Sequence, residues 1–117
     1  MLYLTIIDKK ILAKLKTLGQ VLKEAREAKG LLLRQVAASI NADTAMISKF
    51  EKGERKPSRE QIADLAKVLE KGEKELLVCF FSDKVASDLV NEDVADEVLK
   101  VAKKKIQQMK NKKNGKQ

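Results

Sequence analysis

Histidine is absent from the 117 residues, and cysteine and proline occur once each. The chain therefore lacks the side chain that most often binds metals or acts as a general base near neutral pH. The single cysteine, Cys79, excludes a disulfide within the chain, and its place in the apolar run from Leu76 to Phe81 predicts a buried side chain. No glycine-rich phosphate loop and no converging pair of acids is present either. We expect no metal, no cofactor and no enzymatic activity.

Long apolar runs are also missing from the sequence. No stretch approaches the roughly 18 to 20 apolar residues that are needed to cross a bilayer. The start of the chain, Met1 to Ile11, has no small-residue cleavage site of the kind that ends a signal peptide. These absences predict a cytoplasmic protein with no membrane partner.

The net charge of +8 is distributed unevenly. From Lys100 to the end there are eight lysines and no acidic residue, whereas the preceding 99 residues carry 17 basic and 17 acidic side chains. The basic character thus belongs to the C-terminal segment, and a case for nucleic-acid binding must rest on how charge is arranged in the rest of the chain.

The composition favours helices, because aromatic residues make up only 3% of the chain while alanine, leucine, lysine and glutamate dominate. Apolar periodicity and capping signals predict an all-α fold with helices at about 17–28, 33–40, 44–52, 58–69, 73–81, 83–90 and 92–111. In domain terms, we expect an N-terminal extension (1–16), a folded domain (17–81), C-terminal helices (82–111) and a disordered basic tail (112–117).

Two of the expected helices, 33–40 and 44–52, are short and joined by a tight turn at Asn41 and Ala42. The second contains small polar and basic side chains. A helix of this kind fits the major groove of DNA, where the side chains of its first turns reach the base edges. Spacing alone indicates this weakly, since many helical hairpins look alike.

The residues themselves strengthen the indication. The stretch from 30 to 58, and above all its end, resembles the Xre/Cro-type helix-turn-helix family, which includes the lambdoid phage repressors. The resemblance covers about residues 17–70 and is carried by Gly30, Leu31, Val36, Ala37 and the run Ile47-Ser48-Lys49-Phe50-Glu51-Lys52-Gly53-Glu54-Arg55-Lys56-Pro57-Ser58. It implies a five-helix lambda-repressor-like domain, here with an additional C-terminal helical extension.

The resemblance also implies functional positions. The family inserts its third helix into double-stranded DNA as a symmetric dimer, and its base-reading positions correspond to Asp43, Thr44, Ala45, Ser48 and Lys49. Its phosphate-binding loop corresponds to Lys52, Arg55 and Lys56. The family typically pairs an arginine late in its first helix with a glutamate late in its third, and Arg26 and Glu51 occupy those places, which predicts a largely buried ion pair.

The chemistry of these side chains is consistent with such roles. Thr44 and Ala45 suit contacts with a base edge and a thymine methyl group, and Lys49 can reach guanine or a phosphate. Arg59 adds to the positive charge of the loop. Asp43 would repel phosphates but could accept a hydrogen bond from a cytosine amine, and we favour a helix-capping role for it over a base contact.

The sequence departs from the family at the start of the second helix. Leu32 and Leu33 stand where the family has serine or threonine followed by a phosphate-binding glutamine. The change removes a cap and a phosphate contact and is expected to bring two bulky apolar groups near the DNA-facing edge. Arg34 is the candidate residue to supply a phosphate contact in place of the glutamine.

The C-terminal half suggests an interface between proteins. The run around Phe80 is too apolar for one exposed helix, and the family commonly dimerises through its fifth helix, so we expect a homodimer interface at Leu76, Leu77, Phe80 and Phe81. The apolar stripe of the helices at 82–111 could pack back on the domain, pair with the same helix of a second subunit or bind another protein, and we favour a part in the dimer. The lysines of the tail are either a solvated helix end or an arm that contacts phosphates.

The function predicted from these observations is that of a sequence-specific transcriptional regulator, a repressor or autoregulator that binds DNA as a homodimer. Two alternatives remain open at this stage. The protein could be an antitoxin whose C-terminal helices hold a toxin, or a nucleoid-type protein that coats DNA without regard to sequence.

Overall fold

The computed structural model describes residues 15–115, and within this range every regular element is an α-helix. The predicted all-α fold is confirmed. None of the described helices is both long enough and apolar enough to span a membrane. The expected N-terminal extension lies almost wholly outside the described residues. The helices are α2 (Leu18–Ala28), α3 (Leu33–Ser39), α4 (Thr44–Lys52), α5 (Arg59–Leu69), α6 (Glu73–Leu89) and α7 (Ala95–Gly115).

The starts of α2, α4 and α5 follow from local capping chemistry. Thr17 and Ser58 each accept a hydrogen bond from the backbone N–H three residues later, and Gln20 and Gln61 each accept one from the cap backbone in return. These two reciprocal capping boxes satisfy N–H groups that a helix leaves unpaired at its start. The predicted positions of these three helices are confirmed to within one residue at the start and end.

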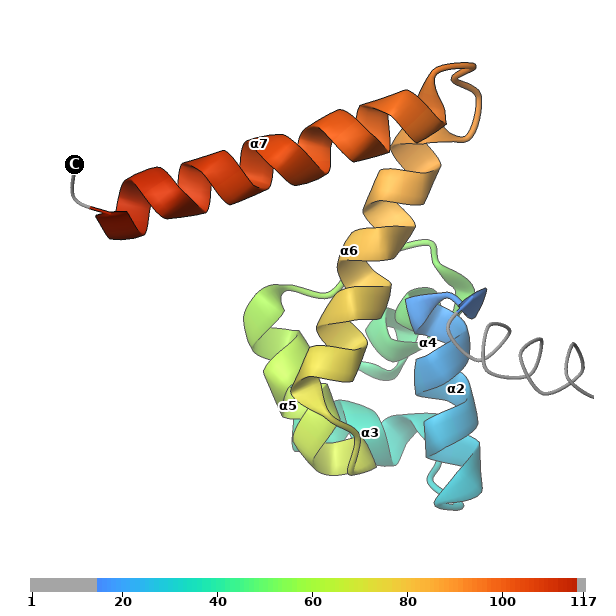
Figure 1. The fold of residues 1–117 in the computed structure, drawn as a ribbon. Coiled ribbons are helices and arrows are strands. Elements are labelled where there is room, and N and C mark those ends of the chain that lie inside the picture. The colour runs from blue at the N-terminus through green and yellow to red at the C-terminus, as the bar shows by residue number, and fades with distance from the viewer. Residues whose placement is uncertain (1–14, 116–117) are drawn as a thin grey trace, which may run out of the picture. The chain divides into compact units, whose positions relative to one another are not determined.

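One apolar core joins α2, α3, α4, α5 and the first half of α6. Figure 1 shows these helices gathered together. Each contributes residues at helical spacing, so one face of each helix is buried. Cys79 belongs to this core, as predicted, and its burial raises the pKa of its thiol. The buried apolar side chains are Leu18, Leu22, Ala25, Val36, Ala37, Ile40, Ile47, Phe50, Ile62, Leu65, Ala66, Leu69, Leu76 and Cys79.

α6 corrects the prediction of two helices at 73–81 and 83–90. A single helix runs from Glu73 to Leu89 without a break. Ser82, which lies between the two expected helices, instead donates a hydrogen bond to the carbonyl of Cys79 at 3.2 Å, which a helix tolerates. Asp83, expected to begin a new helix, accepts a hydrogen bond at 2.8 Å from the backbone N–H of Leu18. Asp83 therefore caps α2, a helix far away in the sequence, instead of its own.

α7 also differs from its predicted bounds. Turn hydrogen bonds from the N–H of Glu92 to the carbonyl of Leu89, and from the N–H of Ala95 to that of Glu92, occupy the segment where a helix start was expected. The helix begins at Ala95 and continues to Gly115, so Lys112 and Lys113 are helical instead of part of a disordered tail. The chain divides into two compact units, the first ending at Lys84 and the second beginning at Val85.

Candidate nucleic-acid interface

The tight turn between α3 and α4 sets the position of the candidate recognition helix. Asn41 adopts a left-handed conformation with φ of 58°, which asparagine tolerates better than most residues. The N–H of Ala42 then donates to the carbonyl of Ala37 at 2.9 Å. Ile40 is buried, and Ala42 packs against the core. Both the backbone and the apolar side chains of the turn thus fix where α4 begins.

α4 presents one face to the core and another to solvent. Ile47 and Phe50 are each only 2% exposed and anchor the inner face. Met46 packs against the core as well, and the Gln61 amide lies 3.5 Å from its sulfur. The predicted base-reading side chains lie on the outer face. Ser48 is half-buried, and the others are exposed, namely Asp43, Thr44, Ala45 and Lys49.

Asp43 is the N-cap of α4. One of its carboxylate oxygens accepts a hydrogen bond from the backbone N–H of Met46 at 2.7 Å. This bond satisfies an unpaired N–H group and places a negative charge at the positive end of the helix dipole. Of the two roles considered for Asp43 from the sequence, capping is the one visible in the structure.

Arg26 and Glu51 connect the end of α2 to the end of α4. The guanidinium donates two hydrogen bonds to the carboxylate, from Nε to Oε2 at 2.7 Å and from Nη2 to Oε1 at 3.1 Å, in a bidentate pair. A third donor, Nη1, bonds the carbonyl of Leu31 at 2.9 Å. The Arg26 and Glu51 side chains are only 12% and 7% exposed, and the hydrogen bond from Arg26 to Glu51 raises the pKa of Arg26. The pair holds α4 against α2 and steadies the chain before α3.

Gly19 permits α2 and α4 to approach closely. A Cβ atom at this position would lie 2.7 Å from the carbonyl oxygen of Phe50 and nearer still to that of Glu51. No side chain fits there unless the backbone moves. The closeness of the two helices at this point is a requirement that the sequence did not reveal, because Gly19 lies inside a helix and looks unfavourable there.

The basic residues predicted to hold phosphates come before, at the end of and after the candidate recognition helix in the sequence. Gly53, with φ of 76°, ends α4 in a left-handed conformation and turns the chain into the loop. Within residues 15–115, none of the predicted phosphate contacts takes part in an ion pair, and all are exposed, which leaves their charges available to a ligand. They are Arg34 in α3, Lys52 in α4, Arg55 and Lys56 in the loop, and Arg59 at the start of α5.

The two leucines at the start of α3 behave differently from each other. Leu33 packs against the core, which corrects the expectation that both would project as bulky apolar groups at this edge. Leu32 precedes the helix and is 49% exposed. The missing side-chain cap is partly replaced, because Gln35 accepts a hydrogen bond from the N–H of Leu32 at 2.7 Å. Only Leu32 therefore changes the surface that a ligand would meet.

The interface predicted on α6 also differs from the structure. Leu76, predicted as part of an interface, is completely buried in the core. Leu77 and Phe80 are both half-buried and pack against the same core. Phe81 remains 46% exposed, and Val78, which was not singled out from the sequence, is 68% exposed. Within the first unit, Val78 and Phe81 are thus the large apolar side chains that the outer face of α6 exposes.

Comparison with known proteins agrees with this geometry. Residues 22–76 match the family model described as helix-turn-helix, and this span runs from the first turns of α2 to the start of α6. No curated protein and no solved structure matches the chain. The match covers the ion pair, the turn, α4 and the basic loop, and it ends before the exposed face of α6.

Proposed function

Since residues 22–76 form an Xre/lambda-repressor-like helix-turn-helix domain, a DNA-binding module, we propose that the protein is a sequence-specific regulator of transcription. It acts as a repressor or autoregulator and inserts α4 into the major groove. The observation that carries the proposal is the outer face of α4, where Thr44, Ala45 and Lys49 are exposed on a helix fixed at both ends. Side chains held on a rigid element can distinguish bases, because they lose little freedom on binding.

The surrounding charges support a defined docking orientation. The basic side chains at 52, 55, 56 and 59 follow the recognition helix, while Arg34 lies at the start of α3. Phosphate contacts around an inserted helix fix its register and orientation in the groove without reading sequence. Asp43 is engaged in its cap, so we assign base reading to Thr44, Ala45, Ser48 and Lys49.

A homodimer completes the proposed mechanism. Two copies would bind half-sites about one helical turn apart on a two-fold-symmetric operator. The outer face of α6 supports this arrangement, because Val78 and Phe81 expose apolar surface beyond the core. Lys84 lies 5.4 Å and 5.7 Å from the ring centres of Phe80 and Phe81, and the two rings meet edge to face. These contacts give the apolar face a defined shape.

Fluorescence anisotropy tests the proposal. DNA from upstream of the protein's own gene is compared with a scrambled duplex across a salt series. A preference of about 1,000-fold or more at physiological salt is expected for a specific regulator. Thr44→Ala and Lys49→Ala should reduce this preference, whereas Lys67→Ala, an exposed lysine on α5, should not. Equal binding to both duplexes, abolished when the lysines after residue 100 are neutralised, would support a sequence-independent DNA-coating protein instead.

A further inference from the structure

α7 carries an apolar surface that its own unit leaves exposed. Val98, Leu99, Val101, Ile106 and Met109 are between 39% and 68% exposed. A shallow apolar depression also lies along the helix, lined by Val94, Val98, Val101, Ala102, Glu97 and Lys105. A helix whose side chains are apolar along one face normally packs that face against another element. The surface lies outside the segment that matches the helix-turn-helix family.

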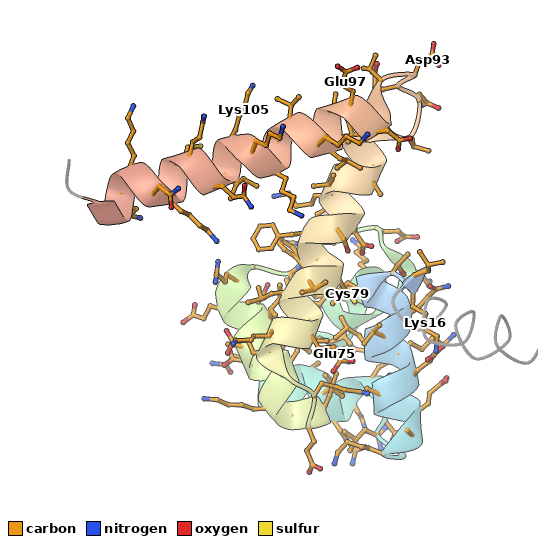
Figure 2. All side chains as sticks on the ribbon, in the orientation of Figure 1. Lys16, Glu75, Cys79, Asp93, Glu97 and Lys105 are labelled. Carbon is orange, nitrogen blue, oxygen red and sulfur yellow. The ribbon has the colours of Figure 1, made fainter. Side chains whose placement is uncertain are left out.

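The charges along α7 are divided by position. Acidic residues occur only before Lys100, at 92, 93, 96 and 97, and every charged residue from Lys100 onward is a lysine. Figure 2 shows Asp93 in the turn before α7 and Glu97 and Lys105 projecting from the helix. None of the ion pairs formed among residues 15–115 involves a residue of α7. The helix therefore has an acidic start and a basic remainder, both without partners within this range.

This division indicates what covers the apolar face. A parallel neighbour of the same sequence would bring acid next to acid and lysine next to lysine, which is unfavourable. An antiparallel copy brings the acidic start of each helix beside the lysines of the other. The surface is thus complementary to itself when related by a two-fold axis, as the interface of a symmetric dimer must be.

We propose that α7 pairs with α7 of a second copy of this chain, antiparallel, about a two-fold axis near Lys100. Residues equally distant from Lys100 then face each other, so that Val94 meets the partner's Ile106 and Val98 meets the partner's Ala102. A large side chain lies opposite a small one in the second pair. Asp96 and Glu97 approach the partner's Lys103 and the partner's Lys104.

The position of Lys100 is compatible with this axis. At 3.6 residues per turn, Lys100 points away from the side of the helix that carries Val98, Ala102 and Met109. The two lysines nearest the axis are thus directed outward and do not oppose each other across the contact. The paired segment buries less surface than a stable interface usually does, so we expect a weak pairing in which copies associate and dissociate readily.

Disulfide cross-linking tests both the pairing and its direction. Val94→Cys and Ile106→Cys are made separately in a Cys79→Ala background, and circular dichroism verifies that each variant folds. The two proteins are mixed under reducing conditions and then oxidised. In the antiparallel pair, two copies of residue 94 lie about 18 Å apart along the helix axis. This is too far for a disulfide, which requires Cα atoms within about 7 Å. The mixture should therefore cross-link at least about tenfold faster than either variant alone.

Two results would overturn the proposal. Rapid cross-linking of Val94→Cys with itself would show a parallel pair. Cross-linking of the mixture no faster than that of Lys100→Cys, an outward-facing control, would show that α7 does not pair with itself.

Charge exchange provides an independent test with the same cysteines. Cross-linking of the mixture should be slower when both acids are reversed (Asp96→Lys with Glu97→Lys) or when both lysines are reversed (Lys103→Glu with Lys104→Glu). The four changes together should restore the original rate. Failure of the fourfold variant to recover would contradict the charge pairing. Because no DNA is present, these results do not depend on whether the proposed regulatory function is correct.

Discussion

At the scale of single residues, Arg26 and Glu51 form a bidentate ion pair whose side chains are both largely buried. Removing either partner leaves a charge in a site that is largely shielded from water, so Arg26→Ala and Glu51→Ala should each lower the free energy of unfolding by about 3–5 kcal/mol. Arg26→Leu combined with Glu51→Leu should cost less than either single alanine change, because no charge remains unpaired. Urea denaturation measures all three. A double variant as unstable as the sum of the single ones would contradict this view.

Gly19 supports a second prediction, which concerns space instead of charge. Gly19→Ala introduces a methyl group against the carbonyls of Phe50 and Glu51, so α2 and α4 must separate. Overpacking of this kind costs about 1–3 kcal/mol. Gly72→Ala is the matched control, since its Cβ would meet no atom nearer than 3.8 Å. Thermal melting should show a lower transition temperature for the first variant only, and similar transition temperatures would mean that the helix contact is not tight.

At the scale of elements, the cap of α4 links stability to binding. Asp43→Ala removes the hydrogen bond to the N–H of Met46 and should lower the free energy of unfolding by about 1 kcal/mol. Asp43→Asn keeps a capping oxygen while it removes a negative charge from the surface that would meet phosphates. This second variant should retain stability and bind DNA more tightly at low salt. Weaker binding by Asp43→Asn would indicate that the carboxylate itself reads a base.

The elements also show what the sequence could and could not predict. The starts of α2, α4 and α5 depend on hydrogen bonds within three residues, and these are visible as capping patterns. The continuity of α6 could not be predicted, because the partner of Asp83 is the N–H of Leu18, 65 positions away. Leu33 was misjudged for a related reason. Whether an apolar side chain at a helix start points inward depends on the neighbouring helices.

The candidate site was predictable in its residues but not in its fine geometry. The run from Ile47 to Ser58 indicated a recognition helix and a basic loop, and the family resemblance pointed to Arg26 and Glu51. No pattern indicated the close approach at Gly19 or the burial of Leu76, since both arise only when separate helices pack. Local chemistry thus predicts which side chains belong to the surface, and packing decides how firmly they are held.

At the scale of the whole molecule, the basic residues around α4 and the lysines of α7 are expected to affect DNA binding differently. The 99 residues before Lys100 carry equal numbers of basic and acidic side chains, so any attraction there comes from local arrangement. The lysines of α7 form an excess of one sign without acids among them. Phosphate contacts from such a segment would strengthen binding to every sequence and weaken as salt rises.

This difference leads to a final prediction, measured as affinity for operator and scrambled DNA over a range of salt. The ratio of the two affinities should stay unchanged in a triple variant that combines Lys110→Gln, Lys112→Gln and Lys113→Gln. If these lysines bind phosphates, both affinities fall, and the slope of log affinity against log salt becomes shallower by about one for each lysine that bound a phosphate. Lys49→Ala should instead reduce the ratio, because a base contact contributes about 1–3 kcal/mol of discrimination. A ratio that collapses in the triple variant, and survives in Lys49→Ala, would place sequence recognition in α7 and contradict the role proposed for α4.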